Sequence, residues 1–336
     1  MIKLVLADMD NTLLPVGQDH VSYRAVTAIR DLLDLGVRFG TATGRDTFEL
    51  DRMFFGARDC FATGIVANGK RVYVDGELRN YSLIDNDAVA RLADMVADVP
   101  NAFVTTLAFD NPRGKEPYCC VGARGGDMAW FEQSIGFTGR LCDHVPSEPI
   151  IAATIACAGS QRQLDDILEQ ARKTVPEFDY VQPTEHWADV LPANLNKGTA
   201  LPLLLTELGI TSDEVLFFGD ADNDLGLMGA LDNSVAVANA TPAAAAAAKW
   251  HIGASDTEAV AQALEELADA IRKGTTPRFM TAAGQVTPQA MSCEDEEDDE
   301  EPTAQALYEL VSAHLAPELG GEAGAMGGAV ADAAEL

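Results

Sequence analysis

Four clusters of polar residues stand directly after apolar runs of the sequence or open a helix. They are Asp8-Met9-Asp10-Asn11-Thr12, Thr43-Gly44-Arg45, Lys197-Gly198 and the acidic segment GDADND at 219–224. Carboxylates this close together repel one another unless a cation lies between them, and hard oxygen ligands suit Mg²⁺. A lysine at the start of a helix suits an anion. The four clusters together predict a metal ion, a phosphate group and a carboxylate nucleophile at one place.

The apolar pattern of the first 273 residues alternates strands with helices. Strands are expected at 3–7, 37–42, 65–67, 215–218 and 235–238, with a hairpin of 71–74 and 77–81. Helices are expected after Ser22 and at 85–97, 161–173, 197–208, 222–229, 242–248 and 256–272, the last with a capping box of Ser255 and Glu258. This alternation predicts a doubly wound, Rossmann-like parallel sheet with helices on both faces. Ligands of such sheets bind at the carboxyl ends of the strands, where the polar clusters fall.

Composition excludes some classes of partner. The 336 residues carry a formal net charge of −30, which disfavours nucleic acid, because phosphate backbones are bound by basic surfaces. No run of eighteen apolar residues occurs, so we expect neither a membrane span nor a secretory signal, and a cytoplasmic protein. The six cysteines show no metal-binding spacing and are predicted to be reduced thiols.

The C-terminal part of the chain differs from the rest. Residues 274–336 hold thirteen acidic residues and one basic residue, and 294–301 is an unbroken run of eight acids. Such composition predicts a disordered, solubilising acidic tail. Within it, 303–315 places Leu307, Leu310 and Leu315 on one helical face, which leaves a docking helix for an unknown partner as the alternative.

The set of motifs resembles the haloacid dehalogenase (HAD) superfamily, in its Cof-type or IIB form. Asp8 to Thr12 resembles motif I, in which Asn11 replaces the usual glycine. The other matching segments are Ala42-Thr43-Gly44-Arg45 (motif II), Ala67-Asn68-Gly69 (the short turn after the third strand), Asn196-Lys197-Gly198 (motif III) and Gly219-Asp220 with Asn223-Asp224 (motif IV).

The spacing of these motifs indicates an inserted domain. Only 33 positions separate Asp10 from Thr43, whereas about 150 separate Arg45 from Lys197. The resemblance therefore implies a catalytic core at 1–82 and 189–273, an α/β cap domain of IIB type at 83–188, and the tail at 274–336.

The resemblance also implies roles for individual residues. Asp8 is the expected nucleophile and Asp10 the expected acid and base. Mg²⁺ is expected at Asp8, the backbone carbonyl of Asp10, Asp220 and Asp224. Phosphate is expected at Thr43, Lys197 and Asn223, and Gly44, Arg45 and Asn68 are expected to support the loop or contact substrate. For Arg45 a surface position is the competing interpretation, and for Asn68 a turn.

The implied activity is Mg²⁺-dependent hydrolysis of small phosphate monoesters, such as sugar phosphates, through an aspartyl phosphate. Three alternatives stay open at this point. One is a phosphosugar mutase of the same superfamily. Another is a phospho-accepting signalling domain, although its acidic pair would be adjacent and its chain shorter. The last is a non-catalytic interaction protein that works through its tail.

Overall fold

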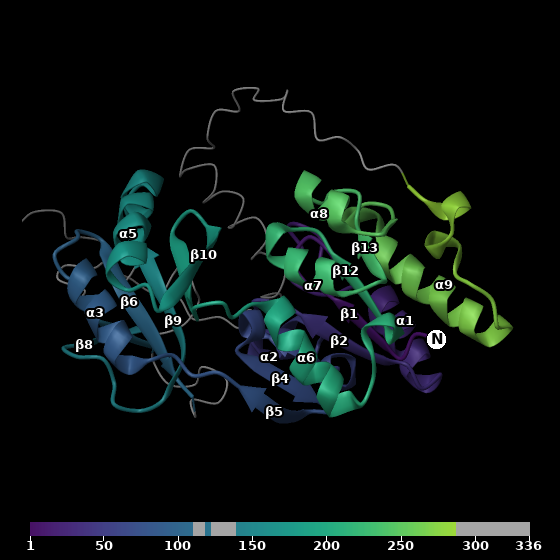
Figure 1. The fold of residues 1–336 in the computed structure, drawn as a ribbon, viewed down its shortest axis with the longest axis horizontal. Coiled ribbons are helices and arrows are strands. Elements are labelled where there is room, and N and C mark those ends of the chain that lie inside the picture. The colour runs from purple at the N-terminus through teal and green to yellow at the C-terminus, as the bar shows by residue number, and fades with distance from the viewer. Residues whose placement is uncertain (110–117, 122–138, 287–336) are drawn as a thin grey trace, which may run out of the picture. The chain divides into compact units, whose positions relative to one another are not determined.

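The structure, a computed structural model, describes residues 1–109, 118–121 and 139–286. Two β-sheets organise them, one of eight strands and one of six (Figure 1). The second sheet is inserted in the chain between the last strand of the hairpin and the helix that begins at Lys197. This arrangement confirms the expected α/β class with an inserted α/β segment. The boundaries predicted for the core and cap domains stay predictions.

The first sheet has the strand order β14-β13-β12-β1-β2-β3-β4-β5, and its strands from β14 to β3 are parallel. All four residues of β1 are buried, because helices cover both faces and the strand must be apolar throughout. The hairpin β4–β5 closes one edge in antiparallel fashion around Asp75-Gly76, as predicted. The strands are β1 (Leu4–Ala7), β2 (Arg38–Ala42), β3 (Thr63–Val66), β4 (Arg71–Val74), β5 (Glu77–Tyr81), β12 (Val215–Gly219), β13 (Ser234–Ala236) and β14 (Trp250–His251).

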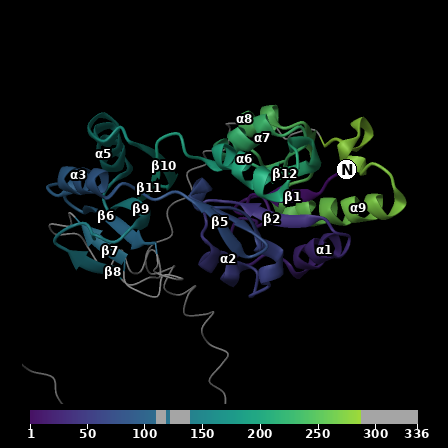
Figure 2. The ribbon, with the colours of Figure 1, turned by 60° about the horizontal axis from the view of Figure 1, so that its bottom comes forward.

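Helices lie on both faces of this sheet, which makes it doubly wound (Figure 2). One face carries α1 (Tyr23–Asp34), α2 (Thr47–Met53) and α9 (Ala259–Lys273), and the other carries α6 (Lys197–Leu208), α7 (Leu225–Ala230) and α8 (Pro242–Ala247). Ser22 caps α1 as expected, since its hydroxyl accepts a hydrogen bond from the N–H of Ala25 at 3.1 Å.

The second sheet is mainly antiparallel and has the order β10-β11-β9-β6-β7-β8. Its strands are β6 (Ala102–Ala108), β7 (Tyr118–Val121), β8 (Gly139–Cys142), β9 (Ile150–Cys157), β10 (Phe178–Thr184) and β11 (Trp187–Pro192). Two amphipathic helices, α3 (Asn86–Val96) and α5 (Gln161–Thr174), pack their apolar positions with β6 and β9 into a core separate from that of the first sheet.

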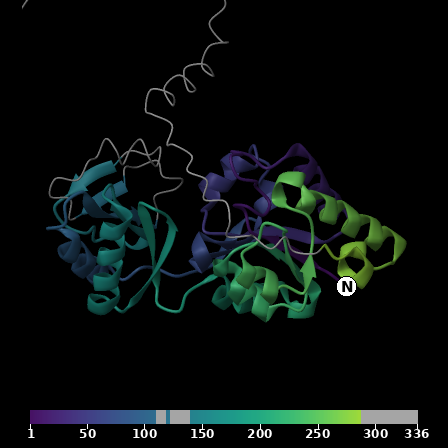
Figure 3. The same ribbon diagram turned by 90° about the horizontal axis from the view of Figure 1, so that it is seen from above.

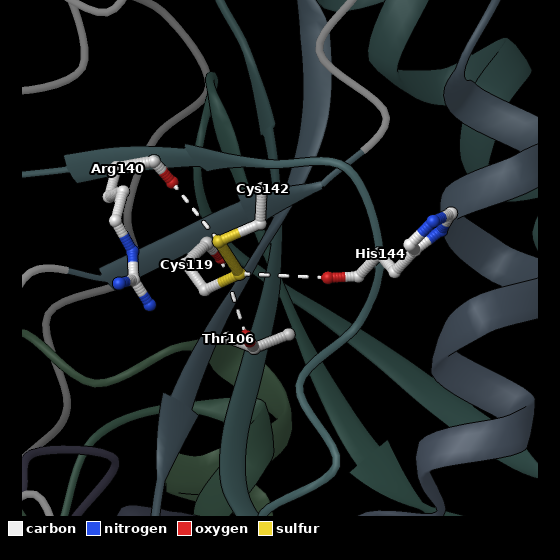
Figure 4. Close-up of a disulfide and its surroundings, with 5 residues drawn as sticks. All are labelled: Thr106, Cys119, Arg140, Cys142 and His144. Atoms are coloured by element: carbon white, nitrogen blue, oxygen red, sulfur yellow. Dashed lines mark hydrogen bonds between the residues drawn. A yellow bond between two sulfur atoms is a disulfide. The ribbon is translucent and has the colours of Figure 1, made fainter.

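A disulfide joins β7 to β8, which corrects the prediction that all six cysteines are reduced thiols. Cys119 and Cys142 lie on adjacent parallel strands, with Cα atoms 5.8 Å apart, a separation typical of disulfides (Figure 4). Sulfur–oxygen contacts to the carbonyls of His144 and Arg140 surround the bond. Cys60 and Cys157 are free and buried, Cys120 is also buried, and Cys293 lies outside the described residues.

The predicted capping box of the last helix is wrong. Glu258 adopts a left-handed backbone (φ 56°, ψ 33°), so the helix begins only at Ala259, and Ser255 belongs to a preceding 3₁₀ turn. The carboxylate of Glu258 instead lies 3.5 Å from the guanidinium of Arg24 on α1. A tertiary contact has replaced the local hydrogen bonds that the sequence pattern suggested.

Residues 274–286, assigned by composition to the acidic tail, are folded onto the first sheet. After α9 the chain turns back along the helix (Figure 3). Phe279 is 4% exposed, with its ring centroid 6.1 Å from that of Phe218 in β12. The side chain of Gln285 accepts a hydrogen bond from the backbone of His251. The predicted start of the tail at Gly274 is therefore corrected, whereas the acid run and the helix at 303–315 lie outside the described residues.

Over the described residues, none of the helices has both the length and the apolar character needed to cross a bilayer.

Candidate active site

The predicted site residues meet at the carboxyl ends of three neighbouring strands. Asp8 follows β1, Thr43 follows β2 and Asp220 follows β12, while Lys197 opens α6. Because β12, β1 and β2 are adjacent and parallel, their last residues end at the same sheet edge. Asn11 has a φ of 61°, so it adopts the left-handed backbone expected where it replaces a glycine.

Lys197 lies at the centre of this edge. Its ammonium group donates to Oδ1 of Asp8 at 2.7 Å and to Oδ1 of Asp224 at 2.8 Å. The lysine is 1% exposed and Asp224 is fully buried. Burial alone would lower the pKa of Lys197, but the two carboxylates outweigh that effect and raise it. The lysine is therefore charged at every physiological pH.

Asp8, Asp220 and Asp224 form a cluster of three buried carboxylates whose oxygens lie within 4.8 Å of one another. Burial raises the pKa of Asp8 to about 7 and that of Asp220 to about 6. Lys197 and the hydroxyl of Thr12, which donates to Asp220 at 2.7 Å, oppose these shifts. One lysine does not neutralise three acids, so the cluster suits a further cation.

Close backbone contacts hold the cluster together. A Cβ at Gly198 would lie 2.6 Å from the carbonyl carbon of Gly226, so the glycine lets the start of α6 touch α7. A Cβ at Gly219 would lie 2.7 Å from Oδ2 of Asp224. That oxygen accepts hydrogen bonds from the N–H groups of Asp220 and Ala221 instead. The glycines of motifs III and IV are thus required by packing.

Asp10 lies outside the three-carboxylate cluster and pairs with Arg45. The guanidinium donates through Nε to Oδ2 at 3.0 Å and through Nη2 to Oδ1 at 2.9 Å, and a further hydrogen bond joins it to Glu49. Burial counts against the charge of Arg45, but the hydrogen bond with Asp10 is the larger effect, and it raises the pKa of Arg45. This geometry agrees with the interpretation in which Arg45 orients an acid of the site.

The loop after β2 is tied to the turn Ala67–Gly69. The N–H of Asn68 donates to the carbonyl of Thr43, and the N–H of Ala67 donates to that of Arg45. A Cβ at Gly44 would lie 3.1 Å from both polar atoms of the Asn68 side chain. Asn68 has a left-handed backbone (φ 57°), and its amide also donates to Oδ2 of Asp189 in β11 at 3.3 Å. Asn68 is therefore both the turn residue and a contact between the two sheets.

A cavity of about 380 Å³ is lined by Asn68, Lys197 and Asn223 together with residues of α5, β10 and β11. Asn223 and Lys197 therefore line the same cavity. A larger cavity of about 990 Å³ is lined by α3 and by residues of β7 and β8, and holds none of the predicted site residues. The smaller cavity is thus the one that contains predicted site residues, namely Asn68, Lys197 and Asn223.

Two parts of the site were missed in the sequence. Thr12 lies inside motif I but was given no role, although a hydroxyl two residues after Asp10 is a possible partner for a nearby acid. Asp189 carried no signal, because a single acid in a strand of the inserted segment is unremarkable in sequence. Its importance depends on contacts across more than a hundred residues.

Comparison with known proteins decides the family. Residues 5–264 match the model of the haloacid dehalogenase-like hydrolases. The chain belongs to this family. The hydrolase is 28% identical to HMP-PP phosphatases of Enterobacter sp. (strain 638) and Escherichia coli O6:H1, over 253 and 245 residues. Each match covers 72% of this chain and 86% of the relative.

Solved structures of the family share the fold of this hydrolase. A haloacid dehalogenase-like hydrolase from Bacteroides thetaiotaomicron is 21% identical with a TM-score of 0.67, and the match covers 80% of this chain and 100% of that one. A HAD subclass IIB sugar phosphatase is 17% identical with a TM-score of 0.64, over 79% of this chain and 98% of that one. The expected superfamily, fold and enzyme class, a HAD hydrolase, are thereby confirmed.

Proposed function

We propose that this hydrolase releases phosphate from small phosphate monoesters, with sugar phosphates as the leading substrate class, through an aspartyl phosphate on Asp8. The observation that carries the proposal is the contact of Lys197 with both Asp8 and Asp224 at the sheet edge, with Asp10 held close by on Arg45. The HMP-PP phosphatases and the sugar phosphatase among the relatives support a small phosphorylated compound as the substrate. The net charge of −30 supports a small metabolite rather than nucleic acid as the partner.

In the proposed first step, Asp8 attacks phosphorus. Lys197 engages Oδ1 of Asp8, and no hydrogen bond to Oδ2 is present among the described residues, so Oδ2 is the oxygen that attacks. As the new O–P bond forms, the bond from phosphorus to the ester oxygen breaks, and Asp10 gives its proton to that oxygen. Thr43, Lys197 and Asn223 bind the phosphoryl oxygens. The products are the free alcohol and the aspartyl phosphate.

In the proposed second step, water attacks the aspartyl phosphate. Asp10, now a carboxylate, accepts a proton from the water as the new O–P bond forms. The bond between Asp8 and phosphorus breaks, which restores the Asp8 carboxylate and releases inorganic phosphate. Asp10 therefore serves as acid and then as base, and Arg45 holds one of its oxygens while the other carries or accepts the proton.

The three-carboxylate cluster fits a magnesium ion. Oxygen ligands, a surplus of negative charge and burial are the conditions under which Mg²⁺ binds proteins. Asp8, Asp220 and Asp224 would hold the ion, together with the backbone carbonyl of Asp10. When bound, Mg²⁺ would offset the repulsion between the Asp8 carboxylate and an incoming phosphate.

We also propose the division into a core at 1–82 and 189–273 and a cap at 83–188, with 274–286 added to the core. Two separate apolar cores support this division.

Phosphate release from a panel of sugar, nucleotide and cofactor phosphates tests the proposal. We expect turnover with Mg²⁺, none in EDTA, and recovery when Mg²⁺ is restored. Asp8→Asn should abolish turnover, whereas the matched control Asp59→Asn, at a surface acid paired with Arg30, should retain it. Isomerised ester without free phosphate would indicate a mutase. Full activity in EDTA would overturn the metal assignment.

A further inference from the structure

Lys70 is a buried lysine that the proposed chemistry does not use. It follows the turn Ala67–Gly69, and its backbone is fixed by hydrogen bonds with Ala67 and Ser82. The residue is 4% exposed, and its ammonium group makes no hydrogen bond or ion pair within the described part of the chain, so only a small contact with solvent is left to it. A charge that is nearly buried and has no protein partner is costly. Such a group calls for a functional explanation.

Two carboxylates act on this ammonium group, those of Asp189 and Asp46. Burial lowers the pKa of Lys70, and the two negative charges oppose that shift. Asp46 is already occupied, because it caps α2 and accepts two hydrogen bonds from Nη1 of Arg71, at 2.7 and 2.9 Å. Of the two acids, Asp189 is therefore the one whose carboxylate can accept further hydrogen bonds.

From the described residues, Asp189 accepts only two hydrogen bonds, and both are long. The side chains of Asn68 and Thr154 each donate to it at 3.3 Å. Burial raises its pKa, and the charge of Lys70 opposes that shift. A carboxylate can accept about four hydrogen bonds and an ammonium group can donate three. Lys70 and Asp189 thus each keep unfilled hydrogen-bonding capacity, and they are too far apart to form an ion pair with each other.

This pair adjoins the side of the catalytic site where the alcohol departs. Asn68, which touches Asp189, also packs against Gly44, between the phosphate ligand Thr43 and Arg45. Arg45 in turn holds Asp10, the acid assigned to the departing oxygen. The leaving group must lie on the Asp10 side of phosphorus. Asp189 accepts a hydrogen bond from Asn68 and Lys70 directly follows the same turn, so both residues lie beside this part of the site.

We propose that Lys70 and Asp189 bind one hydroxyl group of the departing alcohol, which makes them specificity residues for polyhydroxylated phosphate esters. A hydroxyl fits the pair because it donates to the carboxylate and accepts from the ammonium group at once. This inference rests on the proposed phosphatase function. It names residues of this chain that would distinguish a sugar from an apolar alcohol.

Two esters of the same shape test the inference. Glucose 6-phosphate carries ring hydroxyls, and cyclohexylmethyl phosphate has a ring of the same size and none. The variants are Lys70→Met, which keeps the length of the side chain without its charge, and Asp189→Asn. Lys173→Met, at an exposed lysine paired with Glu169, is the matched control. The full-length protein is used throughout, with kcat and KM measured for each ester and thermal melting for each variant.

Each variant should lower kcat/KM for glucose 6-phosphate about tenfold to a hundredfold, because a hydrogen bond to a charged group is lost. The kcat/KM for cyclohexylmethyl phosphate should change less than about threefold, because this ester has no hydroxyl to bind. The control should change neither. Lys70→Met should melt no lower than the wild type, because it removes a charge that is nearly buried and has no protein partner. Equal loss on both esters, or no loss on either, would overturn the inference while leaving phosphatase activity in place. Absence of turnover by the wild type on both esters would overturn the proposed function itself.

Discussion

Arg45 holds both carboxylate oxygens of Asp10 in a two-pronged contact, through Nε at 3.0 Å and Nη2 at 2.9 Å. Such paired hydrogen bonds fix orientation as well as distance. The side chain of Asp10 is 48% exposed, so without Arg45 it would be free to rotate into solvent. The position of the proposed general acid therefore depends on a residue of a different loop.

Arg45→Gln should slow esters with poor leaving groups most. An alkyl alcohol needs the proton of Asp10 in order to depart, whereas p-nitrophenolate hardly needs it. We expect kcat for an alkyl phosphate to fall about tenfold to a hundredfold and that for p-nitrophenyl phosphate to fall less. Arg58→Gln, at a surface arginine paired with Asp51, is the control and should behave as wild type. Equal losses on both esters would show that Arg45 acts on something other than proton transfer.

The two acids of motif I should fail in different ways. Asp8→Asn removes the nucleophile, so no covalent intermediate can form. Asp10→Asn keeps the nucleophile but lacks the base for the second step, so aspartyl phosphate should accumulate with p-nitrophenyl phosphate. Intact mass spectrometry should detect an adduct of about 80 Da, one phosphoryl group, in Asp10→Asn alone. An adduct on the Asp8 variant would reverse the assignment.

Thermal stability without metal should fall as the pH rises from about 5 to about 8. Burial raises the pKa of Asp8 to about 7 and that of Asp220 to about 6. The folded protein therefore holds protons that the unfolded chain releases above its ordinary carboxyl pKa near 4, and this stabilisation is lost as the pH passes the folded values.

Melting curves in EDTA and in MgCl₂ at both pH values provide the measurement. Mg²⁺ should raise Tm more at the higher pH, because it binds the deprotonated carboxylates. Asp220→Asn should show a weaker pH dependence in EDTA, which separates this effect from repulsion among the other acids. A Tm that rises from pH 5 to 8 in EDTA would contradict the assignment.

Truncation after Val286 should preserve the fold and the turnover, whereas truncation after Lys273 should destabilise the protein. The shorter chain loses Phe279, which is buried against Phe218. Loss of a buried phenylalanine costs about 3–5 kcal/mol, which lowers Tm by about 5 °C or more in a chain of this size. Phe279→Ala in the full chain should lose a similar amount. Equal melting of the two truncated chains would show that the segment adds nothing.

The meeting of the proposed catalytic residues at one sheet edge was predictable because their signals are local. Asp8, Thr43 and Asp220 each follow an apolar strand, and parallel strands bring their ends to one edge whatever the loops do. The hairpin around Asp75-Gly76 was predictable for a similar reason, since its turn type follows from two residues. These features need no knowledge of distant contacts.

Features that depend on distant contacts were not predictable. The capping box at Ser255 and Glu258 has a correct local pattern, but Glu258 turns left-handed and reaches Arg24. Phe279 lies in a stretch of tail-like composition, and only β12 beside it makes it part of the core. Cys119 and Cys142 are 23 residues apart, and nothing in that spacing indicates that two adjacent strands bring them together.

The bond between Cys119 and Cys142 makes the intervening chain a closed ring in the covalent structure. A single backbone cut anywhere between these two residues leaves the N-terminal and C-terminal pieces joined through sulfur. Nicked protein would therefore migrate as one species in a non-reducing gel and separate into two fragments only after a thiol is added. The carboxylates proposed for catalysis would lie on different fragments, Asp8 on one and Asp220 on the other, so after reduction only non-covalent contacts, such as the pairing of β1 with β12, would hold the site of a nicked molecule together.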